Sequence, residues 1–124
     1  MPEKILIVDD SVSMRQMLTI VLKGAGYTVE AAAEGPEGIS KLDDDVRAIV
    51  TDYHMPGMNG VEFIRRVRAG AVAASVPIVM LTTESDQSKM EAGREAGATA
   101  WLAKPFDKEK LLKVIKRVTG TATF

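Results

Sequence analysis

The chain has 124 residues, no cysteine and a formal net charge of −1 at pH 7. This length suits one domain with a sizeable core, and the lack of cysteine excludes disulfides, thiolate metal sites and thiol catalysis. A net charge this close to zero does not favour binding to nucleic acid or to an anionic membrane. The sequence shows neither a signal peptide nor a run of the ~20 apolar residues that a membrane helix needs. We therefore expect a cytoplasmic protein.

The first half of the chain alternates apolar runs with amphipathic segments. A strand buried on both faces is predicted over Lys4–Val8, a second, weaker strand over Tyr27–Ala32 and a third strand over Val46–Thr51. The first strand is followed by a predicted helix that Ser11 or Ser13 caps and that ends at Gly24 or Gly26; its apolar stripe is Met14, Met17, Leu18 and Val21. Two further helices are predicted to begin at Gly35 and at Gly60, the second ending near Arg68.

The second half continues this alternation. Strands are predicted over Val76–Leu81 and Ala98–Ala103. Between them, Ser85 or Asp86 caps a helix that ends near Glu95 and is poor in large apolar residues. Asp107 caps the last helix, whose apolar stripe is Leu111, Val114, Ile115 and Val118. Strands that alternate with helices in this way predict an α/β fold with a parallel sheet covered on both faces.

Polar side chains follow four of the five predicted strands. The carboxyl ends of parallel strands are where such sheets bind ligands, and the residues at these ends are Asp9, Asp10, Asp52, Thr82 and Lys104. Three carboxylates need a cation to share a small site. With no cysteine and one histidine, the site suits Mg²⁺ or Mn²⁺ rather than zinc. A lysine and a hydroxyl beside that metal suit a phosphoryl group.

Each of these residues also has an ordinary structural explanation. Asp9 and Asp10 could cap a helix or lie in a solvated turn, and Asp52 could begin the turn that Pro56 and Gly57 shape. Thr82 and Lys104 could be a strand-end residue and a surface lysine. Independent structural roles would not bring all of them to one edge of the sheet, so their convergence favours a functional site.

The combined motif resembles the receiver domain of two-component response regulators over essentially the whole chain. It consists of Asp9-Asp10, Asp52 with Met55-Pro56 and Gly60, Thr82, and Lys104-Pro105-Phe106. Within the family it is most similar to the single-domain chemotaxis regulators of the CheY type. The resemblance implies a flavodoxin-like (βα)5 three-layer sandwich with strand order 2-1-3-4-5, a single receiver domain over 1–124 without an output domain, and a cis Lys104-Pro105 bond.

The resemblance also implies roles for the site residues. Asp52 would be the phospho-acceptor, taking a phosphoryl group from the phosphohistidine of a sensor histidine kinase (CheA-like). Asp10, Asp52 and the backbone carbonyl of His54 would ligate Mg²⁺, and Asp9 would act through a metal-bound water. Lys104 would pair with Asp52 at rest and with the phosphoryl group afterwards.

The resemblance further implies a switch. Thr82 would donate its hydroxyl to the phosphoryl group, and its displacement would let an aromatic residue swing inward. Trp101 occupies that aromatic position, where the family more often has tyrosine or phenylalanine. For His54 two interpretations stay open. It could be an exposed loop side chain, or it could flank the phosphoryl group together with Glu84 and set the rate at which water attacks that group.

We expect the output surface to be the face made by the fourth helix, the fifth strand and the fifth helix, roughly Glu84 to Lys116. Its sparsely anchored fourth helix suits an element that moves. The downstream target expected from the resemblance is a flagellar motor switch protein, bound by a monomer that binds neither nucleic acid nor membrane. As a catalyst the protein would promote only its own phosphorylation and autodephosphorylation.

Other functions fit the sequence less well. A receiver could instead serve as a phosphate sink or as an adaptor. An aspartyl-phosphate hydrolase of the haloacid-dehalogenase type would need a second aspartate where His54 stands. A flavodoxin-like FMN carrier would place phosphate against the repulsive Asp9-Asp10 pair, and a Ser-His-Asp hydrolase lacks its Gly-x-Ser-x-Gly elbow.

Overall fold

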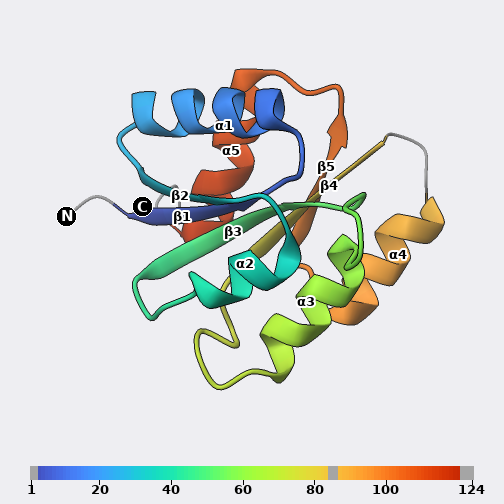
Figure 1. Ribbon diagram of the computed structural model, residues 1–124. Coiled ribbons are helices and arrows are strands. Elements are labelled where there is room, and N and C mark those ends of the chain that lie inside the picture. The colour runs from blue at the N-terminus through green and yellow to red at the C-terminus, as the bar shows by residue number, and fades with distance from the viewer. Residues whose placement is uncertain (1–2, 84–86, 121–124) are drawn as a thin grey trace.

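The computed structural model describes residues 3–83 and 87–120, and its centre is one parallel sheet. The strand order is β2-β1-β3-β4-β5, which confirms the flavodoxin-like topology (Figure 1). The strands are β1 (Lys4–Val8), β2 (Thr28–Ala32), β3 (Val46–Asp52), β4 (Ile78–Thr83) and β5 (Ala100–Lys104). Strands β1 and β3 are buried almost throughout, as their continuous apolar runs predict.

Helices cover both faces of the sheet and complete the three layers (Figure 1). They are α1 (Val12–Gly24), α2 (Gly35–Ser40), α3 (Gly60–Ala69), α4 (Gln87–Ala96) and α5 (Lys108–Thr119). On one face, α1 and α5 pack Leu18, Leu22, Leu111 and Ile115 against the sheet. On the other face, α3 buries Phe63, Ile64 and Val67, with α2 and α4 beside it.

Side-chain caps fix where three helices begin. The Ser11 hydroxyl accepts a hydrogen bond from the Met14 N–H at 3.2 Å, and Asp107 caps α5 by accepting from the Lys110 N–H at 2.8 Å. Both caps were expected from the sequence. Asn59 caps α3 in the same way at 2.9 Å and was not foreseen. The predicted caps of α4, Ser85 and Asp86, lie outside the described residues.

The predicted bounds of β4 and β5 were wrong, because backbone groups near their starts have other partners. Val76 donates its N–H to the Ala73 carbonyl, and its own carbonyl accepts from Arg68, so β4 begins at Ile78 rather than Val76. Ala98 donates its N–H back to Gly93 in α4. Strand β5 therefore begins at Ala100 and continues through Lys104.

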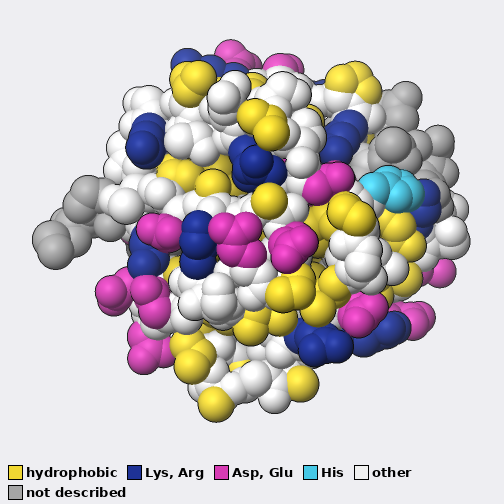
Figure 2. Space-filling model, in the orientation of Figure 1, with side chains coloured by type: hydrophobic (Ala, Val, Ile, Leu, Met, Phe, Trp, Pro, Cys, Tyr) yellow, Lys and Arg dark blue, Asp and Glu magenta, His cyan; other side chains and the backbone are white. Residues whose placement is uncertain are grey.

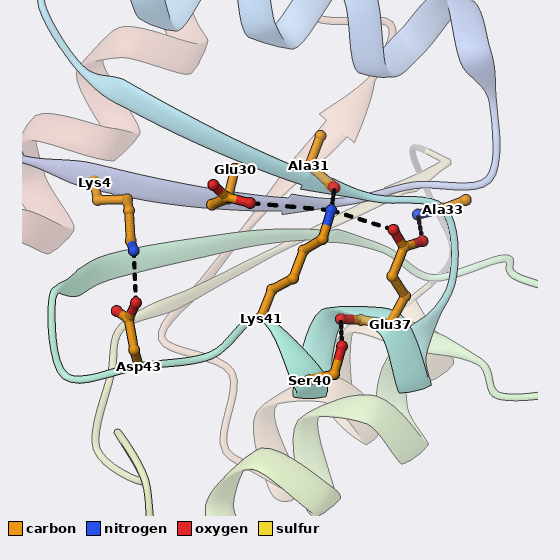
Figure 3. A network of polar contacts seen from close by, with 8 residues as sticks. All are labelled: Lys4, Glu30, Ala31, Ala33, Glu37, Ser40, Lys41 and Asp43. Atoms are coloured by element: carbon orange, nitrogen blue, oxygen red, sulfur yellow. Dashed lines mark hydrogen bonds and ion pairs between the residues drawn. The ribbon is translucent and has the colours of Figure 1, made fainter.

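Polar contacts bind the short helix α2 to the edge strand β2 (Figure 3). Lys41, just after α2, donates to the carbonyl oxygen of Ala31 at 2.6 Å and pairs with Glu37 at 3.2 Å. Glu37 in turn accepts from the Ala33 N–H at 2.8 Å. These contacts satisfy backbone groups at the end of β2, which would otherwise lack a partner strand, and so hold the sheet edge beside Asp9 in place.

Helix α4 has little apolar anchoring. In its described part only Gly93 is buried, and a Cβ there would lie 2.5 Å from Cε of Met80, so the helix rests directly on that methionine. The sparse anchoring agrees with the sequence-based expectation. An element held by few buried contacts has a low cost of local displacement.

The carboxyl end of α4 is held instead by the guanidinium group of Arg68. Its Nε and Nη2 donate to the Gly97 carbonyl at 3.0 and 2.7 Å, and its Nη1 donates to the carbonyls of Ala74 and Val76 at 2.8 and 2.6 Å. Burial lowers the pKa of this guanidinium group from its usual value. One side chain thus joins the end of α3, the loop before β4 and the turn after α4.

We expect Arg68→Met to destabilise the protein by about 2 kcal/mol, because three carbonyls lose charge-assisted donors. Amide exchange at Gly97 and Ala98 should also accelerate. Denaturant unfolding and hydrogen exchange measure the two effects. Arg66→Met is the matched control, since among the described residues Arg66 makes only an exposed pair with Glu62. Its loss should cost less than about 0.5 kcal/mol. Equal effects of both variants would contradict this role of Arg68.

Among the described helices, none has the length and apolar character needed to cross a membrane.

Candidate functional site

The site is built around Asp52, the last residue of β3. Its side chain is almost fully buried, with a residue exposure of 5%. Lys104, the last residue of β5, donates from Nζ to Asp52 Oδ1 at 3.0 Å. The ion pair spans the width of β4, which lies between the two strands. A buried carboxylate at a strand end thus has the cationic partner that its desolvation requires.

Two more carboxylates from the end of β1 join Asp52. Asp9, Asp10 and Asp52 each offer an oxygen atom, and these oxygens lie within 4.8 Å of one another. Strand pairing explains the convergence, because β1 runs beside β3 with Val8 opposite Thr51. The polar ends of adjacent parallel strands therefore meet, as the sequence predicts for this edge of the sheet.

Asp9 has an unusual environment for a carboxylate. It is fully buried; its Oδ1 accepts from the Ser11 N–H at 2.9 Å, whereas Oδ2 has no hydrogen-bond partner among the described residues. Burial, and secondarily the charge of Asp52, raises the pKa of the Asp9 carboxyl. An unpartnered buried oxygen beside two other carboxylates is the environment that a hard divalent cation satisfies. The residues present therefore fit Mg²⁺.

The loop after β3 is shaped by backbone contacts. The Tyr53 N–H donates to the Leu81 carbonyl at 2.9 Å, and the Gly60 N–H donates to the Tyr53 carbonyl at 2.8 Å. At Gly60 a Cβ would lie 2.5 Å from the carbonyl oxygen of Asp52, so glycine lets α3 begin directly against the aspartate backbone. Gly57 takes a left-handed φ of 79° within the same turn. The Lys104-Pro105 bond is cis, as the resemblance implied.

The two predicted switch residues lie on adjacent strands. Thr82 is buried in β4, and Trp101 is 39% exposed in β5. Met80 pairs with Trp101 and Thr82 with Ala103, so these side chains share one face of the sheet. Trp101 borders a shallow hollow of about 190 Å³ against α4, whose other lining residues are Gln87, Met90, Glu91 and Arg94. In this arrangement the indole points outward beside α4.

Of the two predicted tuning residues, only His54 lies within the described residues, and Glu84 does not. His54 is exposed, with its Nε2 3.0 Å from Nζ of Lys89 in α4. Figure 2 shows the histidine side chain on the surface with a basic side chain beside it. No sequence motif indicates this Lys89 contact, since the two residues are 35 positions apart.

The sheet order, the acidic cluster and the ion-paired aspartate define an α/β domain with an aspartate-centred acidic site at the carboxyl edge of its parallel sheet. Residues 5–116 match the family model described as the response regulator receiver domain. The chain therefore belongs to the receiver-domain family of response regulators.

Curated relatives within this family include chemotaxis proteins. The chain is 36% identical over 121 residues to the chemotaxis protein CheY1 of Helicobacter pylori, covering 95% of this chain and 98% of that protein. It is 33% identical over 125 residues to a chemotaxis protein CheY homolog of Campylobacter jejuni, covering 97% of this chain and 95% of that protein.

Solved structures agree with these relatives. The chemotaxis protein CheY4 of Vibrio cholerae superimposes with a TM-score of 0.90 at 45% identity, covering 95% of this chain and 99% of that one. The second structure is the receiver domain of the sensor histidine kinase PA1611 from Pseudomonas aeruginosa, solved with a magnesium ion in its active-site cleft. It superimposes with a TM-score of 0.87 at 28% identity, covering 97% of this chain and 99% of that one. The CheY-like fold predicted from the sequence is thus confirmed.

Proposed function

We propose that this protein is a phosphorylation-controlled switch whose phospho-acceptor is Asp52. The observation that carries the proposal is the buried Asp52 carboxylate, ion-paired with Lys104 and grouped with Asp9 and Asp10. In phosphoryl transfer the protein supplies position and charge rather than covalent chemistry of its own. The donor, proposed to be a phosphohistidine on a CheA-like sensor kinase, loses its P–N bond as an Asp52 oxygen forms a P–O bond.

In this proposal Asp10, Asp52 and the backbone carbonyl of His54 hold Mg²⁺, with Asp9 completing the acidic surroundings. When bound, the ion neutralises the negative charge that develops on the transferred group. The magnesium in the PA1611 receiver supports this assignment, as does the unpartnered Asp9 oxygen. Mn²⁺ prefers similar oxygen ligands and is a possible substitute.

In this proposal Lys104 and Thr82 respond to the phosphorylation of Asp52. Lys104 moves its charge from the free carboxylate to the phosphoryl oxygens, and Thr82 donates its hydroxyl to them. Trp101 responds on the neighbouring strand, so the surface of α4, β5 and α5 is proposed as the output surface. Trp101 and the weakly anchored α4 line the same hollow, which supports this route.

The partner and setting are proposed from the relatives. CheY-type relatives that match nearly the whole chain favour chemotaxis, with a flagellar motor switch protein as target. A role as a phosphate sink or adaptor would use the same site with another partner. We propose further that residues 1–124 act as one monomeric receiver in the cytoplasm, and that its only catalysis is its own phosphorylation and dephosphorylation.

Labelling by acetyl phosphate tests the proposal without a kinase. We expect one phosphoryl group per chain by intact mass in Mg²⁺ and none with a chelator, because the acidic site needs a cation to accept an anion. Amide exchange should then change most in α4, β5 and α5. No labelling in Mg²⁺ would overturn the proposal, and labelling that leaves exchange in these elements unaltered would overturn the assigned output surface.

A further inference from the structure

Lys89 of α4 lies against the two residues that follow Asp52. Its Nζ is 3.0 Å from His54 Nε2 and 5.0 Å from the centroid of the Tyr53 ring. The Tyr53 and His54 rings meet edge to face, with centroids 4.8 Å apart. We refer to Tyr53, His54 and Lys89 as the lysine cluster.

Within the cluster, His54 and Tyr53 interact with the ammonium group in two different ways. A lysine ammonium group can only donate, so His54 Nε2 accepts the hydrogen bond. The face of the Tyr53 ring attracts the same positive charge. The hydrogen bond needs a donor and the attraction to the ring needs a cation, and an apolar side chain of similar length supplies neither.

Two members of the lysine cluster, Tyr53 and His54, line a hollow that reaches the acidic cluster at Asp10. Asp10, Tyr53 and His54 line one surface hollow of about 350 Å³, together with Met55, Pro56 and Asn59. Water reaching a phosphoryl group on Asp52 from this hollow would pass the His54 ring. With Nε2 bound to Lys89, the ring has no free acceptor for a proton of that water on this nitrogen.

We propose that Lys89 is a positioning residue that prolongs the life of the phosphoryl group by holding the His54 ring away from the attacking water. The proposal rests on the function proposed above and adds a contact from α4 that regulates the same site. In the regulated step a water oxygen bonds to phosphorus as the P–O bond to Asp52 breaks. Inorganic phosphate leaves, the Asp52 carboxylate returns, and the proton of the water passes to solvent.

The contact also links signal lifetime to the output surface. Lys89 belongs to α4, the helix with little apolar anchoring. A partner that displaces α4 would draw Lys89 from His54 and free Nε2, so binding at α4 would shorten the signal. The link needs no change in the residues that hold the phosphoryl group.

Decay of the labelled protein tests the proposal in Mg²⁺ after acetyl phosphate is removed. We expect Lys89→Met to accelerate decay by about fivefold, the effect of one lost hydrogen bond, and Lys89→Arg to restore the wild-type rate. In a His54→Leu background, Lys89→Met should change the rate less than about twofold. Lys23→Met, at an exposed lysine of α1 outside the proposed output surface, is the matched control and should decay as wild type.

A spectroscopic measurement separates the contact from general structural effects. In the wild-type protein the ¹⁵N shifts of His54 should show Nδ1 carrying the proton, and Lys89→Met should redistribute it between the ring nitrogens. Decay that is unchanged in Lys89→Met, or equally accelerated with and without His54, would overturn the proposal, as would an unchanged tautomer. If the wild-type protein takes no label, the proposed function itself fails, and the lifetime role of Lys89 fails with it.

Discussion

Asp52→Asn should abolish labelling by acetyl phosphate, with a loss of at least about a thousandfold in rate. The amide is nearly isosteric with the carboxylate but lacks the anionic oxygen that attacks phosphorus. The variant should fold, because the amide oxygen can still accept from Lys104, which donates to Asp52 Oδ1 in the wild-type protein. Intact mass after incubation in Mg²⁺ gives the extent of labelling directly.

The matched control for this loss is Asp45→Asn. Asp45 is exposed and immediately precedes β3, whereas Asp52 ends the same strand. Its replacement removes one carboxylate from the far end of the strand and should leave labelling at the wild-type rate. Full labelling of Asp52→Asn, or equal loss in both variants, would remove Asp52 from the role proposed for it.

Asp9→Asn should raise the free energy of unfolding in the absence of Mg²⁺, by on the order of 1 kcal/mol. The wild-type protein buries the Asp9 carboxylate with an unpartnered Oδ2, close to Asp52. Asparagine keeps the acceptor for the Ser11 N–H and removes the buried charge. Stabilisation by added Mg²⁺ should shrink in the same variant, since one charge of the acidic site is gone.

The pH dependence of this effect has a definite sign. Burial and the nearby Asp52 raise the pKa of Asp9 in the folded protein above its value in the unfolded chain. Between these two values the folded state binds more protons, so the stability of the wild-type protein falls as pH rises through that window. The advantage of Asp9→Asn should therefore be small near pH 4 and should grow as the pH rises above the pKa of an aspartate in the unfolded chain.

Urea unfolding of both proteins at several pH values, with and without Mg²⁺, measures the effect. Asp10→Asn is the informative comparison, because Asp10 belongs to the same acidic cluster but is exposed. It should weaken the response to Mg²⁺ with little gain in stability. An Asp9→Asn variant that is less stable than wild type at pH 7 without Mg²⁺ would contradict the account.

Much of the fold could be predicted because its signals are local. The apolar run Lys4–Val8 and the stripe of α5 specify buried elements by their spacing alone. Strand order came from the family resemblance. The starts of β4 and β5 could not be predicted, because hydrogen bonds to other parts of the chain decide them. Arg68 donates to the Val76 carbonyl, and the Ala98 N–H, in the turn after α4, donates to the Gly93 carbonyl.

The site residues could likewise be predicted from local signals, whereas the long-range contacts around them could not. Asp9, Asp10, Asp52 and Lys104 were expected at one edge because each follows a strand, and the structure brings them together. The roles assigned to them are still predictions. Lys89 was missed because its contact with His54 depends on how α4 packs, and no motif marks it.

Asp52 is the residue proposed to carry the phosphoryl group. Reductive trapping with borohydride tests this proposal most directly, because it converts a phosphorylated aspartate to homoserine and releases phosphate; peptide mapping then locates the altered residue. Protein labelled in Mg²⁺ should contain homoserine at position 52, and none should form when a chelator is present. Homoserine at position 9 or 10, or a phosphoryl group on His54 or Thr82, would contradict it.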